Sequence, residues 1–147
     1  MTALSSETVH ASCVAIDGRA VLLWGRSGSG KSDLALRLID RGAALVCDDY
    51  TLLVRRDGRL FATPPATIAG RIEVRGVGIV AMPYLRDVEV ALVVDLEAPV
   101  ARLPDPATRR LAGIDVPLAA LAALEASAPI KIELLLKRPP AGQENGA

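Results

Sequence analysis

The residues best suited to chemistry form one glycine-rich segment with the spacing Gly-x-x-x-x-Gly-Lys-Ser. We expect phosphates to bind at Gly25, Ser27, Gly28, Ser29, Gly30, Lys31 and Ser32. Glycines let the backbone curl so that successive N–H groups point inward at phosphate oxygens. Lys31 supplies a positive charge for the β- and γ-phosphates, and the Ser32 hydroxyl can ligate Mg²⁺. The segment therefore predicts a site for ATP and Mg²⁺.

Two apolar segments end in aspartate, and either could supply the carboxylate that phosphoryl transfer needs. One is Ala44–Cys47, followed by Asp48 and Asp49, and the other ends in Asp95. Adjacent carboxylates repel each other, so the pair is costly to bury without a cation. The pair also follows the helix expected after the loop, as a neighbouring parallel strand would, with its carboxyl end facing the phosphates. We therefore favour Asp48 and Asp49 and keep Asp95 as the alternative.

The segments that flank the loop predict how it is positioned. Ala20–Trp24 is continuously apolar, as expected of a buried strand. Ser32–Arg41 has an apolar face at helical spacing, and Gly42 lies where a helix commonly ends. We expect Ala20–Trp24 and Ala44–Cys47 to be core strands of one sheet, joined by this helix in a right-handed crossover between parallel strands.

The rest of the chain predicts further strands and weaker helices. Strands are predicted at Val9–Ile16, Thr51–Val54, Arg59–Ala62 and Val88–Leu96. Other predictions are a partly extended Ile72–Val80, helices at Ala107–Leu111 and at Leu118–Ala126 before Pro129, and a strand or helix at Ile130–Leu136. The predicted fold class is α/β, a P-loop-containing kinase-like domain with a mixed sheet and flanking helices. It should span residues 1–138 as a single domain, with a disordered tail at 139–147.

Composition excludes several classes of protein. The chain has 147 residues, with 17 basic and 17 acidic side chains, so it lacks the basic footprint of a nucleic-acid binder. No apolar run approaches the roughly 18 residues of a membrane span, and the N-terminus lacks the apolar core of a signal peptide. Cys13 and Cys47 are expected to be free, buried thiols in a reducing compartment. We expect a cytoplasmic protein without membrane or nucleic-acid partners.

Four segments, taken in their order and spacing, resemble the catalytic domain of the HPr kinase/phosphorylase family. They are His10, the loop of residues 25–33, Leu45–Asp49 and Ile72–Ile79. The block Ile72–Ile79 is the most specific, because many nucleotide-binding proteins share the loop. The likeness runs from about His10 to Leu136. It implies an ATP-dependent serine kinase that phosphorylates HPr, a phosphocarrier of the phosphotransferase system, and can remove that phosphate with inorganic phosphate.

The resemblance also implies roles for individual residues. Asp48 would take the proton of the acceptor serine, and Asp49 would support it and the metal. Glu73 would lie at the metal, and Arg75 would contact the substrate. His10 would be an active-site residue close to the two aspartates. Glu73 and Arg75 are two positions apart, so in a strand they would share a face.

Two features depart from the family pattern. Only nine residues precede His10, whereas long family members carry an N-terminal domain, so we expect a truncated, catalytic-domain-only form. The family's basic loop is matched by Ala119–Ala128, which contains no arginine. The missing cation counts against the phosphorylase reaction and the family's homo-oligomer, although Arg109 or Arg110 could replace it.

Two other functions remain open on the sequence. A nucleotide-binding regulator without transferase activity would account for the missing basic loop. A small-molecule kinase of another P-loop family would usually carry a lid with several arginines, and Asp105–Arg110 is short for one. Transfer of phosphate from ATP to HPr is the observation that separates these alternatives from the serine kinase.

Overall fold

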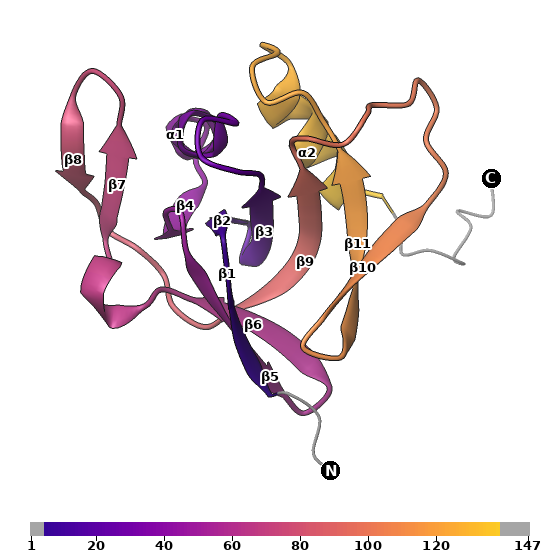
Figure 1. Ribbon diagram of the computed structural model, residues 1–147, viewed down its shortest axis with the longest axis horizontal. Helices are drawn as coiled ribbons and strands as arrows, with labels where there is room; N and C mark the ends of the chain where they lie inside the picture. Colours follow the sequence, from indigo (N-terminus) through magenta and orange to yellow (C-terminus); the bar gives the residue numbers. More distant parts are fainter. Residues whose placement is uncertain (1–4, 139–147) are drawn as a thin grey trace.

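The computed structural model describes residues 5–138, which form a curled mixed sheet with two helices and a separate hairpin (Figure 1). In chain order the elements are β1 Ser6–Val9, β2 Ala11–Ile16, β3 Arg19–Trp24, α1 Lys31–Asp40, β4 Ala44–Cys47, β5 Thr51–Arg56, β6 Arg59–Thr63, a 3-10 turn Ala66–Ile68, β7 Arg71–Val74, β8 Gly78–Ala81, β9 Val88–Asp95, β10 Ala107–Leu111, β11 Ile114–Ala120 and α2 Ala128–Leu136. The α/β class with a mixed sheet and flanking helices is confirmed. The single domain over 1–138 stays a prediction, and the tail at 139–147 lies outside the described residues.

The main sheet follows the order β1-β5-β6-β9-β3-β2-β4. Strand β9 runs parallel to β3 along one edge, pairs with β6 at its start and runs parallel to β11 at its end. Strand β10 pairs with β11, and the hairpin β7–β8 forms a sheet of its own. The carboxyl ends of β3, β9 and β11 therefore meet at one edge, which is the edge where the phosphate loop begins.

Strands β3 and β4 lie in the same sheet, as predicted, but they are not neighbours. Strand β2 lies between them and pairs antiparallel with both. The prediction of a neighbouring parallel strand is wrong in this detail, because the chain places β2 against β3 by a tight turn before the loop begins. The start of β2 consequently lies beside the ends of β3 and β4, so three segments converge at one edge.

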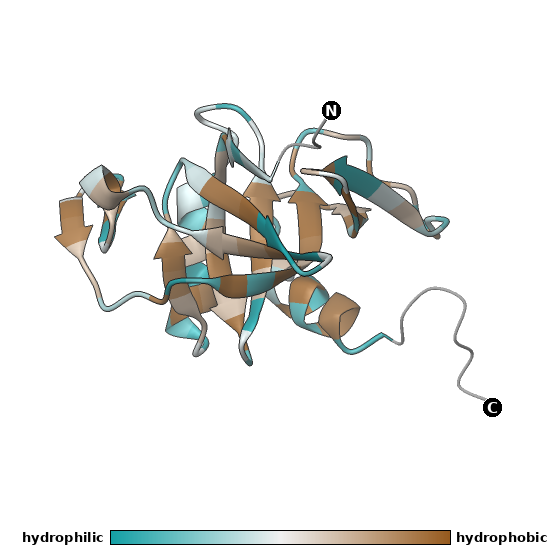
Figure 2. Ribbon diagram, turned by 90° about the horizontal axis from the view of Figure 1, so that it is seen from below, coloured by the Kyte–Doolittle hydropathy of each residue, from teal (hydrophilic) through white to brown (hydrophobic). Residues whose placement is uncertain are grey.

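The two faces of the sheet bury different clusters, as the alternation of side chains along the strands requires. On one face, Leu22 packs with residues of β2 and β6, and within residues 5–138 neither α1 nor α2 contributes to this cluster. On the other face, Leu23 packs with Leu34 of α1 and Ile132 of α2. Figure 2 shows the apolar strands of the sheet and the mixed colouring of the helix that leads to the C-terminus. Within residues 5–138 no helix is long and apolar enough to cross a membrane.

Two predicted helices are wrong. Ala107–Leu111 is strand β10, and the first residues of Leu118–Ala126 belong to β11. Long-range pairing overrides the helical preference of alanine and leucine here, because β11 adds to the buried end of β9. Pro129 does not stop a helix but lies in the first turn of α2, where its missing N–H costs nothing. Residues 130–136 are thus helical.

The predicted strand Val9–Ile16 is two strands with a bend at His10. Strand β1 pairs only with β5, whereas β2 pairs with β3 and β4. The chain changes sheet neighbours at His10, and the bend places this side chain at the edge where the loop begins. The predicted strands Thr51–Val54 and Arg59–Ala62 are confirmed as β5 and β6, which pair as a hairpin, and Asp57 and Gly58 adopt the positive φ angles that its two-residue turn requires.

Candidate active site

The phosphate loop runs from the end of β3 to the first turn of α1, and its shape depends on glycine. A side chain on Gly25 would collide with Ser29, and one on Gly30 would meet the Cβ of Ala123 at 2.9 Å. Gly30 is the N-cap of α1 with φ +97°, and no side chain caps this helix. The first N–H groups of α1 have no partner within the helix, so they can bind an anion.

Two side chains of the loop fit a phosphate ligand. The Oγ of Ser29 is buried without a hydrogen-bond partner among the described residues, and phosphate oxygens are acceptors for such a group. Lys31 is only 4% exposed, and its Nζ donates to the carbonyl of Gly25 at 2.6 Å. This bond closes the loop on itself and holds the ammonium group at its mouth.

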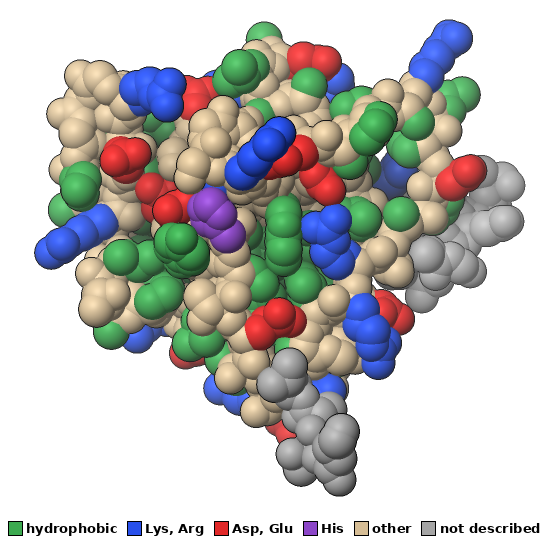
Figure 3. Space-filling view, in the orientation of Figure 1, with side chains coloured by type: hydrophobic (Ala, Val, Ile, Leu, Met, Phe, Trp, Pro, Cys, Tyr) green, Lys and Arg blue, Asp and Glu red, His purple; other side chains and the backbone are tan. Residues whose placement is uncertain are grey.

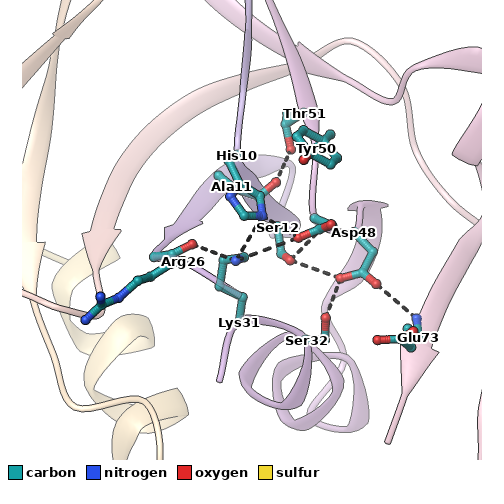
Figure 4. A network of polar contacts seen from close by, with 12 residues as sticks. His10, Ala11, Ser12, Arg26, Lys31, Ser32, Asp48, Tyr50, Thr51 and Glu73 are labelled. Atoms are coloured by element: carbon teal, nitrogen blue, oxygen red, sulfur yellow. Dashed lines mark hydrogen bonds and ion pairs between the residues drawn. The ribbon is translucent and has the colours of Figure 1, made fainter. Parts of the chain in front are cut away.

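His10 lies close to Lys31 (Figure 4), and Asp49, which follows the end of β4, contacts both of them. The Nε2 of His10 lies 2.7 Å from Oδ1 of Asp49, and Nζ of Lys31 lies 3.7 Å from the same oxygen. Because a carboxylate only accepts, Nε2 carries the proton, and its 3.4 Å approach to Nζ is a contact without a hydrogen bond. Tyr50 stacks on the imidazole with ring centroids 4.9 Å apart, which orients the histidine.

Asp48 is the buried member of the pair and faces different partners. Its Oδ1 accepts from the hydroxyls of Ser32 at 2.6 Å and Ser12 at 3.0 Å. Its Oδ2 accepts from the N–H of Glu73 at 2.9 Å. Ser32 and Asp48 thus present two oxygens side by side, the ligand type that Mg²⁺ prefers. Among residues 5–138 no three His, Cys, Asp or Glu side chains form a metal site, so a bound cation would also need phosphate oxygens.

Glu73 and Arg75 do not share a strand face. Strand β7 ends at Val74, and Arg75 follows it in the exposed turn to β8. Glu73 approaches the site through its backbone N–H, and its side chain is exposed beside Asp48. The structure therefore brings Glu73 to the edge of the centre and leaves Arg75 outside it.

Asp95 is the last residue of β9, a position similar to that of Asp48 after β4. Unlike Asp48, it has a carboxylate whose hydrogen bonds come from the turn that follows and from an arginine. Oδ1 accepts from the N–H groups of Glu97 at 2.9 Å and Ala98 at 3.0 Å, and Oδ2 accepts from Arg109 at 3.1 Å. Burial alone would raise the pKa of Asp95, but these three donors outweigh it and hold the pKa below its usual value. Asp95 thus fixes the turn after β9 and anchors an arginine.

Comparisons with known proteins agree with this geometry. The family profile described as HPr Serine kinase C-terminal domain matches residues 2–101. The HPr kinase/phosphorylase of Chlorobium luteolum is 41% identical over 128 residues, which cover 76% of this chain and 38% of that protein. The enzyme of the same name from Clostridium novyi is 45% identical over 83 residues, which cover 56% of this chain and 27% of that protein.

A solved structure extends the likeness. It is the Hpr(Ser) kinase/phosphatase from Coxiella burnetii, with a TM-score of 0.78 and 33% identity over 88% of this chain and 93% of that one. The chain belongs to the HPr serine kinase family. The resemblance drawn from the sequence motifs is confirmed, and the chain spans less than two fifths of the length of the two curated relatives.

Sequence reasoning missed two residues of this site, Ser12 and Tyr50. Ser12 is fully buried in β2 and joins the aspartate pair, because its hydroxyl donates to Asp48 and accepts from the N–H of Asp49 at 3.1 Å. A signal was present, since Ser12 is the one hydroxyl in an otherwise apolar strand, and a buried hydroxyl needs partners. No sequence signal pointed to the stacking of Tyr50 on His10.

Proposed function

We propose that this chain is an ATP-dependent protein serine kinase whose acceptor is an HPr-like phosphocarrier. The observation that carries the proposal is the 2.6 Å contact between Ser32 and Asp48 at the mouth of the phosphate loop. It joins the residue expected at the nucleotide's metal to a carboxylate, the type of group that accepts the proton of an acceptor hydroxyl. The family names of the relatives support HPr as that acceptor, and a cytoplasmic location fits two buried, unpaired thiols.

The residues of this chain divide the binding of ATP and Mg²⁺ among them. The N–H groups of the loop and of the first turn of α1 would bind the phosphates, with Lys31 beside the γ-phosphate. Ser32 and Asp48 would hold Mg²⁺, with Asp49 and Glu73 nearby. Bound ATP with its metal supplies the phosphoryl group and neutralises the charge that develops on it.

Proton transfer belongs to the aspartate pair. Asp48 would take the proton of the acceptor serine as the serine oxygen bonds to the γ-phosphorus and the bond from that phosphorus to the bridging oxygen breaks, which releases ADP; the family resemblance supports this role. Asp49 is the second candidate, because it lies beside Lys31 and His10 and is 46% exposed. His10 orients Asp49 in either case.

The proposal is limited to transfer from ATP. The stretch matched to the family's basic loop, Ala119–Ala128, contributes no cation. Instead it packs on the phosphate loop, where Ala123 contacts Gly30 and Arg37 of α1 donates to the carbonyl oxygens of Ala123 and Glu125. Self-association of the chain stays a prediction.

One assay tests the function. The full chain is incubated with ³²P-labelled ATP, Mg²⁺ and purified HPr, and the phosphorylated residue is mapped. We expect label on a serine of HPr and none when Mg²⁺ is removed. ATP binding without transfer would instead support a nucleotide-binding regulator, and label on a small molecule would support a small-molecule kinase.

A further inference from the structure

A hollow of about 520 Å³ opens beside the phosphate loop. It is lined by His10, by Trp24, Gly25 and Arg26 at and after the end of β3, and by Asp95, Glu97 and Ala98 at and after the end of β9, and Arg26 pairs with Glu97 there. Trp24 packs against the cluster on the helix-free face of the sheet, so the hollow opens on the side away from α1. Figure 3 shows acidic and basic side chains gathered with hydrophobic ones on this side, next to the histidine.

Arg109 of β10 lies against two residues that line this hollow, Trp24 and Asp95, and each of them holds it in place. Its guanidinium lies over the ring of Trp24, 4.9 Å from the centroid, and donates to Asp95 at 3.1 Å. A guanidinium has five N–H donors, and within residues 5–138 the bond to Asp95 is the only hydrogen bond of this side chain. Arg26, the other arginine at the hollow, is 85% exposed against 29% for Arg109. Arg109 is thus the preorganised cation.

The direction of phosphoryl transfer places the acceptor on this side. The attacking and leaving oxygens lie roughly in line on opposite sides of the transferred phosphorus. The N–H groups of the loop and of the first turn of α1 would bind the leaving β-phosphate, on the helical face of the sheet. The acceptor must approach from the opposite side, past Lys31. Both His10 and Gly25 contact Nζ of Lys31 and line the hollow, so the hollow lies on that approach.

We infer that the hollow receives the segment of the acceptor protein next to its serine, with Arg109 donating to main-chain carbonyl oxygens and Trp24 packing on an apolar neighbour. This inference rests on the proposed kinase function and names the surface that recognises its acceptor. An arginine stacked on an aromatic ring loses little freedom when it binds, which suits it to recognition. It also gives this chain a cation near the acceptor although Ala119–Ala128 has none.

Arg110 provides the matched control. It follows Arg109 in β10, so its side chain points to the other face of that strand. It pairs with Asp115 at 3.1 Å and is 68% exposed. Alanine at either position removes one guanidinium and one ion pair from the same strand, but of the two only Arg109 contacts residues that line the hollow.

Steady-state kinetics with varied HPr tests the inference. For Arg109→Ala we expect KM for HPr to rise about 10-fold or more, with KM for ATP unchanged and kcat within about twofold, since binding outside the reacting atoms changes KM. Arg109→Lys should recover only part of the loss, because lysine keeps the charge but not the planar stack. Arg110→Ala should match the wild type. Thermal unfolding of each variant identifies any loss of fold.

Trp24 supplies a direct reading in the unaltered protein, since it is the only tryptophan of the chain. Addition of a tryptophan-free HPr in the presence of a non-hydrolysable ATP analogue should change its fluorescence. Bound HPr without a fluorescence change would overturn the inference, as would a folded Arg109→Ala variant with normal KM for HPr. A wild-type protein that binds ATP but neither binds nor phosphorylates HPr would instead overturn the proposed function, and the inference with it.

Discussion

The ends of β4 and β9 carry the same short pattern, an apolar strand followed by aspartate, yet the two carboxylates have different surroundings. Asp48 accepts hydrogen bonds from two hydroxyls and a backbone N–H, and the neighbouring Asp49 pairs with the ammonium of Lys31. Asp95 meets two backbone N–H groups and an arginine of its own sheet. The first carboxylate shares its donors with a ligand site, whereas the second is satisfied by the fold. The partners of an aspartate, and not the strand that precedes it, indicate whether it does chemistry.

Exchange of each aspartate for asparagine is the strongest test of this contrast. Asp48→Asn keeps the shape but removes the proton acceptor, so kcat for transfer to HPr should fall about 10²–10⁴-fold. Calorimetry should still detect ATP binding, because Lys31 and the loop remain. Asp95→Asn should keep kcat within about threefold and raise KM for HPr, since only the anchor of Arg109 is weakened.

Two outcomes would rearrange the site. Normal transfer by Asp48→Asn with loss in Asp49→Asn would assign the proton to Asp49. Normal transfer by Asp48→Asn and Asp49→Asn, together with a loss of kcat in Asp95→Asn, would place the active site at the end of β9. The likeness to the family would then concern the fold and not the catalytic residues.

Lys31 pairs with Asp49 after β4, and Arg109 pairs with Asp95 at the end of β9. Substitution of these two cations should separate ATP binding from acceptor binding. Lys31→Ala removes a buried ammonium from the loop, and ATP affinity measured by calorimetry should fall about 100-fold or more. Arg109→Ala should leave this affinity unchanged. Lys131→Ala, which removes an exposed lysine of α2 paired with Glu125, is the control. Unchanged ATP affinity in Lys31→Ala would show that this loop is not the nucleotide site.

Stability against pH should reveal the ion pair at β9. The folded state lowers the pKa of Asp95, so its contribution is present above the unfolded pKa of about 3.9 and is lost as pH falls through the lowered value. At neutral pH, urea unfolding should show Asp95→Asn to be less stable than the wild type by up to about 1 kcal/mol. The difference should shrink in acid. Asp115→Asn, at an exposed pair, should show no such difference, and equal stability of Asp95→Asn at neutral pH would refute the prediction.

The smallest expected effect concerns the residue before each aspartate, Cys47 in β4 and Val94 in β9. Burial raises the pKa of Cys47 to about 11, against hydrogen bonds that lower it. Its contribution to stability is present below the unfolded thiol pKa of about 8.5 and is lost as pH rises toward 11. Cys47→Val, unfolded by urea in reductant, should lose less stability over that range. An unchanged slope would assign the alkaline loss to the other buried thiol, Cys13.

The local part of the site could be predicted from the sequence. Glycine spacing, an apolar strand before it and an amphipathic helix after it fix the phosphate loop within a short stretch, and the structure has β3 and α1 within one residue of the prediction. Both cysteines are buried and free, as predicted. The aspartate pair was singled out by the repulsion of its charges, and it does lie beside the loop.

Features that depend on distant pairing could not be predicted. Nothing in the composition of Leu118–Ala126 indicates that its first residues join the end of β9, because alanine and leucine favour helices in isolation. The insertion of β2 between β3 and β4 depends on which strands pair across the sheet. The position of Arg109 over Trp24 follows from that same pairing, so sequence reasoning could only name Arg109 and Arg110 together.

The match to the family profile ends at residue 101, and Arg109 lies beyond it. The parts assigned to phosphate and proton chemistry, from His10 to Glu73, fall inside the matched stretch, and so do the residues that line the hollow, whereas Arg109, which packs on Trp24, belongs to β10. One contact of the proposed acceptor site is therefore encoded outside the stretch that carries the proposed phosphate chemistry. A substitution at Arg109 would weaken the proposed acceptor binding while every residue from His10 to Glu73 stays the same.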